Sequence, residues 1–371
     1  MTTTAPASPT AAFGRFFLPG PTEVLPEILA AQTRPMIGHR GKSMEQLIAQ
    51  MMPGLQRIFQ TGRPVYICSS SATGLMEAAI RNCGGRRVLS LVNGAFSERF
   101  FRIAKANGCE ATALELPLGQ AHTPELLADA LRKGPYDAVT VVHSETSTGA
   151  LNPIEQLARV ARAAGDVLLL VDSVTGVAGA RVETDAWDLD FVLTGSQKAL
   201  ALPPGLALGV AQPRALERAR KQTNRGTYFD LVEFESYILK NQTPNTPALS
   251  LMYALAAQVV RIERETIEAR WARHLAMAGR TWRWADELRG RGIPVSVLAP
   301  EGYRSPTVTC LTLPPGRKGS EINDAMKARG FTISAGYGSL KDSTIRIGHM
   351  GDHTVAELDV LLAALEEVLS A

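Results

Sequence analysis

The stretch FVLTGSQKALALPPG, residues 191–205, joins a short apolar run to a polar turn that contains one lysine, Lys198. A similar junction precedes it, where the apolar run VLLLV (167–171) leads into VDSVTG (171–176) and its aspartate, Asp172. Continuous apolar runs of this length are typical of strands that are covered on both faces. Two charged side chains are therefore expected at the ends of two buried strands.

Further apolar runs of the same kind lie on either side of these two. They are VYIC (65–68), RVLSLV (87–92), ATALEL (111–116), AVTVV (138–142) and ALGVA (207–211). Helical periodicity fills several of the gaps, over residues 74–82, 96–107, 124–133 and 154–164, and a further helix is predicted over 43–60. Strands that alternate with helices predict an α/β fold with a mostly parallel, seven-stranded sheet. In such sheets, ligands bind at the carboxyl ends of the strands.

The C-terminal part of the chain has a different pattern. One long helical stretch, with a break expected in its charged middle, runs over residues 247–292. Short strands (294–298, 307–313, 331–334, 345–347) and helices (320–329, 354–369) follow, which predicts a smaller α+β domain. The expected organisation is a disordered tail (1–16), an extended Pro-rich arm with the large domain (17–265), and the small domain (266–371).

Composition excludes several classes of protein. The 371 residues carry a net charge of +3, which is too small to indicate a surface that binds nucleic acid. The longest apolar runs are too short for a transmembrane helix, and the first residues lack the pattern of a signal peptide. The cysteines have neither metal-binding nor redox spacing. We therefore expect a cytoplasmic protein with no metal site, no membrane partner and no nucleic-acid partner.

Residues after the strands suit one particular cofactor, pyridoxal 5'-phosphate. Its aldehyde requires a lysine amine, for which Lys198 is the candidate, and its ring nitrogen requires a carboxylate, for which Asp172 is the candidate. Phe96 could stack on the ring. The phosphate requires backbone N–H groups and hydroxyls at a helix start, which residues 71–73 (Ser-Ala-Thr) could supply.

These motifs resemble the class V aminotransferase family, whose members are fold-type I pyridoxal-phosphate enzymes. The nearest members are the alanine–glyoxylate, serine–glyoxylate and serine–pyruvate aminotransferases. The resemblance runs from about residue 17 to the C-terminus. It rests on LPGPTEV (18–24), GHR (38–40), SSSATGLMEA (69–78), NGAFSER (93–99), HSETSTG (143–149), VDSVTG (171–176), GSQKALALPPG (195–205), TPNTPA (243–248) and IRIGHMG (345–351).

The resemblance implies a role for each matching residue. Lys198 corresponds to the Schiff-base lysine, Asp172 to the partner of the pyridine nitrogen, and Phe96 to the aromatic residue over the ring. The phosphate-binding positions are Ser71, Ala72, Thr73 and Gln197.

The resemblance also implies where the substrate and a second chain bind. Arg346 corresponds to the arginine that binds the substrate α-carboxylate, and Thr146 lies near both the cofactor and the substrate, with Gly20 beside the substrate. Thr243 and Thr246 correspond to residues that reach the partner's phosphate across a homodimer with shared active sites. Some relatives have tyrosine at the position of Thr243.

The function implied is a transaminase that moves an amino group from serine or alanine to glyoxylate or pyruvate by a ping-pong mechanism. Phosphonate, phosphoserine or ureidoglycine transaminases and lyases of the same fold are alternatives, as is a non-catalytic binding protein on this scaffold. A cysteine desulfurase is disfavoured because Cys310 lies inside the apolar run TVTCLTL. His39, Arg40 and Arg225 have no assigned role, and His143 is expected to be structural.

Overall fold

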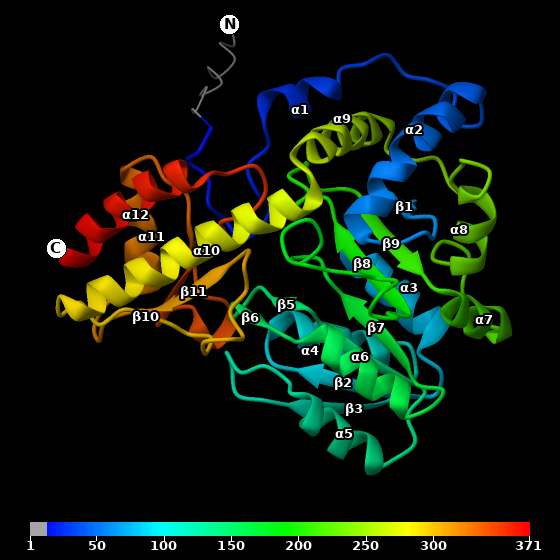
Figure 1. Cartoon of the computed structure of the whole chain (residues 1–371), viewed down its shortest axis with the longest axis horizontal. Coiled ribbons are helices and arrows are strands. Elements are labelled where there is room, and N and C mark those ends of the chain that lie inside the picture. Colours follow the sequence, from blue (N-terminus) through cyan, green and yellow to red (C-terminus); the bar gives the residue numbers. More distant parts are fainter. Residues whose placement is uncertain (1–12) are drawn as a thin grey trace, which may run out of the picture.

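Two packed units joined by a pair of consecutive helices make up the computed structural model, which describes residues 13–371 (Figure 1). The larger unit is built on a seven-stranded sheet with the strand order β1-β9-β8-β7-β4-β2-β3. Its strands are β1 (Tyr66–Cys68), β2 (Arg87–Val92), β3 (Glu110–Glu115), β4 (Ala138–Val142), β7 (Leu168–Asp172), β8 (Phe191–Gly195) and β9 (Ala207–Ala211). The α/β fold and the strand positions agree with the prediction.

The sheet is mostly parallel. Within the described sheet only β9 runs against its neighbours, pairing antiparallel with both β8 and β1. Strands β4, β7, β8 and β9 are buried at every residue, as expected for strands covered on both faces. Strand β3, at the edge, consists of exposed and partly buried residues. The carboxyl ends of β7 and β8 therefore open at the same edge of the sheet.

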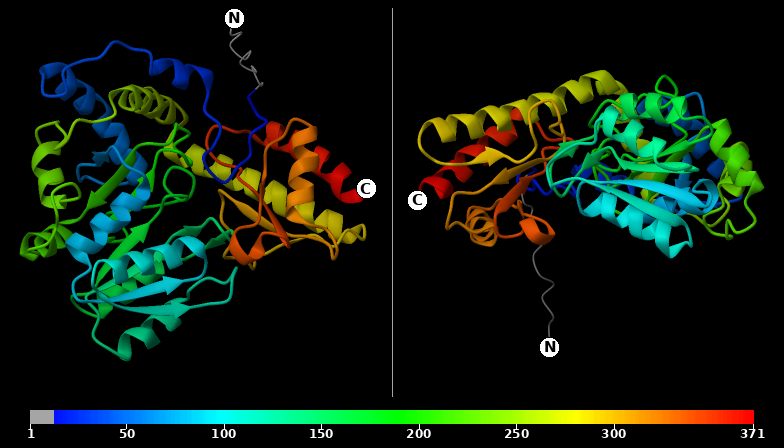
Figure 2. Two further views of the ribbon diagram at one scale, coloured as in Figure 1. Left: turned by 180° about the vertical axis from the view of Figure 1, so that it is seen from behind. Right: turned by 90° about the horizontal axis from the view of Figure 1, so that it is seen from below.

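Helices cover both faces of this sheet (Figure 2). Helices α3 and α4 pack against each other and against the sheet, while α5 and α6 pack against each other elsewhere on it. No helix among residues 13–371 is both long enough and apolar enough to cross a membrane. The helices of this unit include α2 (Lys42–Phe59), α3 (Ala72–Cys83), α4 (Ala95–Ala106), α5 (Pro124–Arg132), α6 (Ile154–Ala163), α7 (Pro213–Lys221) and α8 (Leu231–Ile238).

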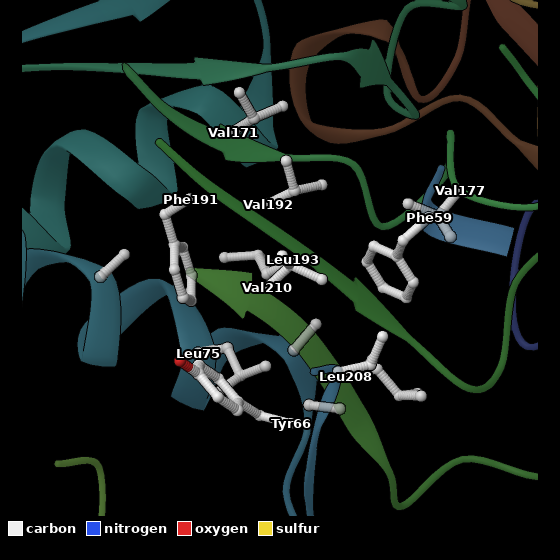
Figure 3. Packing of buried hydrophobic residues seen from close by; sticks show 14 of the residues in the cluster. Phe59, Tyr66, Leu75, Val171, Val177, Phe191, Val192, Leu193, Leu208 and Val210 are labelled. Atoms are coloured by element: carbon white, nitrogen blue, oxygen red, sulfur yellow. The ribbon is translucent and has the colours of Figure 1, made fainter. Parts of the chain in front are cut away.

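The core around the central strands is formed by aliphatic and aromatic side chains from strands and helices together (Figure 3). Phe191, Val192 and Leu208 are fully buried there, and Phe59 from α2 and Leu75 from α3 pack onto the same cluster. Burial of an aromatic or branched side chain contributes about 1.5–3 kcal/mol to folding. This core holds the ends of the strands in fixed positions.

The second unit is a four-stranded antiparallel sheet with the order β10-β11-β13-β12. Its core includes Trp284 from α10, Leu311 from β11 and Leu365 from α12. The elements are β10 (Ser296–Val297), β11 (Thr309–Thr312), β12 (Ser334–Ala335), β13 (Thr344–Ile347), α10 (Ile267–Gly290), α11 (Gly319–Ala328), α12 (Val355–Ser370) and a short 3-10 helix, Gly338–Leu340. The strand expected over 331–334 is displaced, because Phe331 and Ile333 enter the core from an irregular segment.

The long helical stretch is interrupted at Thr266. Helix α9 (Leu249–Glu265) ends there, and α10 begins at the next residue. Thr266 has a φ of +69° and its hydroxyl accepts a hydrogen bond from the Ala269 N–H, so it caps the second helix. The expected break in the charged middle is therefore present, directly after residue 265, where the domain boundary is predicted.

The N-terminal arm is ordered further upstream than predicted and is not wholly extended. Residues 1–12 lie outside the described part, but residues 13–16, expected in the disordered tail, are bound to the protein. The backbone N–H groups of Gly14, Arg15 and Phe16 donate to the Glu23 carboxylate, and Phe16 forms a bridge with Thr332. The arm also contains helix α1 (Pro26–Ala31), which begins with a proline in its first turn.

Candidate active site

A cavity of about 320 Å³ lies at the carboxyl ends of the central strands. Most of the predicted cofactor and substrate residues line it together, although they come from distant parts of the sequence. They are Gly20, Ser71, Ala72, Thr73, Phe96, Thr146, Asp172, Gln197 and Lys198. The predicted residues Arg346, Thr243 and Thr246 do not line this cavity.

Lys198 lies in the turn that follows β8, and only 7% of its surface is exposed. Its Nζ atom donates a hydrogen bond to the carbonyl oxygen of Pro19 in the N-terminal arm. Gly20 has a φ of +119°, and a Cβ atom there would lie 2.6 Å from Cδ of the lysine, so the arm can approach only with glycine. Burial, aided by the positive charge of Arg346, lowers the pKa of Lys198 to about 7. A substantial fraction of the amine is therefore neutral near neutral pH.

Asp172 ends β7 and is 3% exposed. One carboxylate oxygen, Oδ1, accepts a hydrogen bond of 2.8 Å from the Val174 N–H, and the other has no partner among the described residues. Burial raises the pKa of Asp172 to about 7, against the lowering effect of the Val174 hydrogen bond. A protonated ring nitrogen beside the free oxygen would supply the missing partner and charge.

The start of helix α3 forms a cradle at another wall of the cavity. Ser71 occupies the N-cap position but its side chain makes no capping hydrogen bond. The backbone N–H groups of Ala72 and Thr73 have no acceptor among the described residues, while the next one, Gly74, donates to Ser71. Free N–H groups at a helix start bind phosphate well. These residues fit the phosphate of pyridoxal phosphate.

Gln197 is held beside the same cradle by a close approach of the backbone. A Cβ atom on Gly195 would lie 2.7 Å from Oε1 of Gln197 and 3.4 Å from the Cβ of Ala72. A side chain at position 195 would therefore fill the space between the lysine turn and the start of α3. The glycine of GSQK thus keeps the cradle open.

Phe96 lies in the first turn of α4 (Ala95–Ala106) and its ring forms a wall of the cavity. The Nζ atom of Lys198 is 5.9 Å from the ring centroid, and the ring of Tyr337 is 5.7 Å away, centroid to centroid. A planar cofactor attached to the lysine would therefore lie within reach of this ring. The arrangement supports the predicted stacking position.

Glu145, which the sequence analysis did not single out, fixes the start of α4. Its carboxylate is fully buried and accepts hydrogen bonds from the N–H groups of Phe96, Ser97 and Ser147 and from both serine hydroxyls. A carboxylate at a helix start is favoured by the helix dipole. The available signal was a single acidic residue among small polar ones in HSETSTG (143–149).

Thr146 and Arg346 are adjacent, but only the threonine lines the cavity. Nη1 of Arg346 donates to the Thr146 carbonyl oxygen at 3.3 Å, and Nη2 to the Ser334 hydroxyl at 2.8 Å. Nε donates to the Ala335 carbonyl oxygen at 3.2 Å. Since a guanidinium carries five N–H donors, two remain for a ligand. The Thr146 hydroxyl itself is 2.5 Å from the hydroxyl of Thr175.

Thr243 and Thr246 lie in a separate loop. The Thr243 hydroxyl donates to the Asn245 carbonyl oxygen at 2.8 Å, and the Thr246 hydroxyl is 3.4 Å from Nε2 of His39. Arg40 donates to the carbonyl oxygens of Thr243 and Pro244 at 2.5 and 2.6 Å. His39 and Arg40 therefore hold this loop and do not enter the cavity of their own chain.

The remaining candidates have local partners. Nε of Arg225 lies 2.9 Å from both carboxylate oxygens of Asp230. His143 is buried, hydrogen-bonds Ser173 at 3.0 Å, and burial lowers its pKa to about 4, so it is neutral at physiological pH. Cys310 is buried in β11, where burial raises its pKa to about 11, which is opposite to what a reactive thiol requires.

Known proteins resemble this chain over nearly its whole length. The sequence matches the aminotransferase class-V family over residues 24–360. An uncharacterised aminotransferase of Methanocaldococcus jannaschii is 38% identical over 95% of this chain and 91% of its own length. The serine–glyoxylate aminotransferase of Arabidopsis thaliana is 31% identical over 95% of this chain and 89% of its own length.

A solved aminotransferase structure has the same fold as this chain. The crystal structure of an alanine–glyoxylate aminotransferase from Nostoc aligns with a TM-score of 0.91 and 28% identity, over 99% of this chain and 98% of that one. Family match, relatives and fold thus agree over nearly the whole chain. The chain belongs to the class V aminotransferases and is a pyridoxal-phosphate-dependent transaminase of fold-type I.

Proposed function

We propose that this transaminase moves an amino group from a small L-amino acid, serine or alanine, to glyoxylate or pyruvate by a ping-pong mechanism. The observation that carries the proposal is the position of Arg346, which keeps free N–H donors beside the cavity wall at Thr146. One such arginine binds one carboxylate, which suits monocarboxylic substrates. The names of the serine–glyoxylate and alanine–glyoxylate relatives agree with this substrate class.

Lys198 would be the group that moves the proton. When bound, pyridoxal phosphate supplies an electron sink for the charge left when the Cα–H bond of the amino acid breaks. The Nζ amine of Lys198 would take that proton and return it, and its pKa of about 7 makes the neutral amine available at neutral pH. Asp172 would hold a proton on the ring nitrogen through its free oxygen. Phe96 would keep the ring in place by stacking.

Arg346 would orient the substrate. A guanidinium binds a carboxylate through two parallel hydrogen bonds, which fixes both position and rotation. Its hydrogen bonds to Ser334 and Ala335 hold the guanidinium in one orientation. Donor and acceptor both carry an α-carboxylate, so one arginine serves both half-reactions.

The active sites would be shared in a homodimer. Thr243 and Thr246 line no part of the cavity in their own chain, although the family places these positions at the partner's phosphate. Their loop is held by Arg40, which supports a role for the loop as a preformed surface. In this arrangement each phosphate cup is completed by the other chain.

A panel of amino donors against oxo-acid acceptors tests the proposal. The donors are serine, alanine, aspartate, phosphoserine, 2-aminoethylphosphonate and ureidoglycine, and the acceptors are glyoxylate, pyruvate and 2-oxoglutarate. We expect the highest kcat/KM with serine or alanine and with glyoxylate or pyruvate, and parallel double-reciprocal lines. A clear preference for phosphoserine, a phosphonate or ureidoglycine would replace the proposed substrates with one of the alternatives. Lyase products, or no turnover with any pair, would reject transamination of these substrates.

A further inference from the structure

The phosphate cradle at the start of α3 lacks positive charge of its own. It offers backbone N–H groups, the hydroxyls of Ser71 and Thr73, and the amide of Gln197, all of them neutral. A phosphate monoester carries a charge of about −1.5 to −2 at pH 7. Moving that charge out of bulk water is unfavourable. The N–H groups of a helix start offset part of this cost, and a nearby cation would offset more of it.

Among the residues that the structure describes, two cations line the cavity, Lys198 and Arg99. The amine of Lys198 serves the aldehyde and the Cα proton, so it does not provide a permanent charge for the phosphate. Of these two residues, Arg99 is the one that can provide a permanent positive charge for the phosphate. It is the last residue of NGAFSER (93–99), and its contribution was not anticipated from the sequence.

The position of Arg99 fits the cradle. It lies on α4 one turn after Phe96, and its Nη1 atom is 3.4 Å from the Thr73 hydroxyl at the start of α3. Its guanidinium carbon is 5.0 Å from the centroid of the Phe96 ring. The side chain therefore spans from the ring-stacking residue to the phosphate cradle.

Arg99 also differs from the other arginine on its helix. Arg102 is paired with Glu98 at 3.7 Å, and 66% of its side chain is exposed. Arg99 is partly buried, and it forms no ion pair with any of the residues that the structure describes. A partly buried guanidinium without a carboxylate partner has donors available for an anion.

We infer that Arg99 binds the phosphate of pyridoxal phosphate, together with the amides of Ala72 and Thr73. Its planar fork can donate to two phosphate oxygens while the ring of Phe96 packs against it. The inference rests on the cofactor and not on the identity of the amino donor.

The test compares two forms of the cofactor. The cofactor is removed from the full-length chain, and pyridoxal 5'-phosphate and pyridoxal are each titrated while the absorbance of the bound form is followed. With Arg99→Gln, we expect the affinity for pyridoxal 5'-phosphate to fall roughly 10- to 100-fold, and the affinity for pyridoxal to change less than about twofold. Arg99→Lys should lie in between, because an ammonium keeps the charge but loses the fork.

Arg102→Gln is the matched control, because it removes the same charge from the same helix outside the cavity, and it should leave both affinities unchanged. Thermal unfolding of all variants, followed by circular dichroism, checks that the fold is retained.

An equal loss of affinity for both forms of the cofactor would overturn the inference, and so would no loss for either. The inference would also fail if Arg99→Gln altered only the KM of dicarboxylic donors, since the guanidinium would then bind substrate. None of the binding titrations contains an amino acid, so their result is independent of the donor panel.

Discussion

At the scale of single residues, burial brings the pKa values of an acidic and a basic side chain close to each other. Burial disfavours the charged form of either group, so it lowers the pKa of Lys198 to about 7 and raises that of Asp172 to about 7. Shifted pairs of this kind mark sites of acid–base chemistry. A cationic ring nitrogen beside Asp172 would reverse its shift, because it stabilises the carboxylate. The site is thus suited to a ligand that brings positive charge to one end.

The lowered pKa of Lys198 gives a pH dependence that can be measured. The neutral amine is the reactive form, so the rate of cofactor uptake by the cofactor-free chain should rise as the pH rises through about 7 and should then level off. An unshifted lysine, with a pKa near 10.5, would show that rise only in strongly alkaline buffer. Stopped-flow absorbance measures the uptake.

Lys198→Ala should abolish borohydride-stable attachment of the cofactor and lower turnover by at least roughly 10²–10⁴-fold. Wild-type turnover by that variant would exclude the lysine from the chemistry.

Arg346 gives a second prediction at this scale. Arg346→Ala should lower kcat/KM for amino donor and oxo acid alike by roughly 30- to 5,000-fold, because losing a partly desolvated charge pair costs about 2–5 kcal/mol. Arg346→Lys should restore little, since an ammonium cannot form the bidentate pair. Single-turnover kinetics of each half-reaction measures the effect, and the absorbance of the bound cofactor should be unchanged. Values within a factor of a few of wild type would place the carboxylate site elsewhere.

At the scale of elements, the position of Phe96 depends on how α4 begins. The Glu145 carboxylate accepts hydrogen bonds from the first turn of α4 and from Ser147 in the loop after β5 (Ser144–Glu145). That loop leads into β6 (Ala150–Leu151), which pairs with β5. One buried carboxylate thus connects α4, which carries Phe96, to the hairpin that carries Thr146. Glu145 forms no ion pair with any residue that the structure describes, and the N–H groups of the helix start offset part of the cost of burying its charge.

Replacing this carboxylate should therefore affect both stability and cofactor binding. In Glu145→Gln the amide NH₂ faces backbone and hydroxyl donors, so at least one buried donor loses its acceptor, at a cost of about 1–3 kcal/mol in the free energy of unfolding. Affinity for pyridoxal phosphate should fall as Phe96 loses its fixed position. Urea denaturation and cofactor titration measure the two effects. Glu98→Gln, on the exposed face of the same helix, should change the free energy of unfolding by less than about 0.5 kcal/mol. Equal behaviour of the two variants would show that Glu145 has no special role.

At the scale of the whole molecule, Thr243 and Thr246 lie outside the cavity of their own chain, in a loop that Arg40 holds through hydrogen bonds to the carbonyl oxygens of Thr243 and Pro244. A shared site predicts complementation between two defective chains. Thr246→Glu should repel the partner's phosphate, and Lys198→Ala removes the amine. When the two variants are mixed and refolded together, hybrid dimers should regain one working site, because one chain supplies the lysine and the other supplies Thr246.

Activity assays of the mixture and of each variant alone measure this recovery, and sedimentation gives the oligomeric state. Mixing wild type with the Glu98→Gln chain controls for losses on refolding. A fully active monomer, or a mixture no more active than its parts, would contradict a shared site.

The sequence by itself determined the large sheet and singled out Lys198 and Asp172, which line one cavity. Strands such as 138–142 and 207–211 are located to the residue, because strands buried on both faces are continuous apolar runs bounded by polar turns. Lys198 and Asp172 were found because strand order brings strand ends to one edge, wherever they occur in the chain. The strand expected at 331–334 was misplaced because short strands carry little periodic signal.

Only the tertiary structure decided which neutral or charged residues from helices and loops join that centre. Arg99 and Glu145 lie on a helix and a hairpin whose sequence patterns do not reveal which neighbour they face. Gly20 meets Lys198 because the arm folds back from the start of the chain, a contact with no local signal. The pKa shifts follow from burial, and burial is a property of the whole packed molecule and not of any segment.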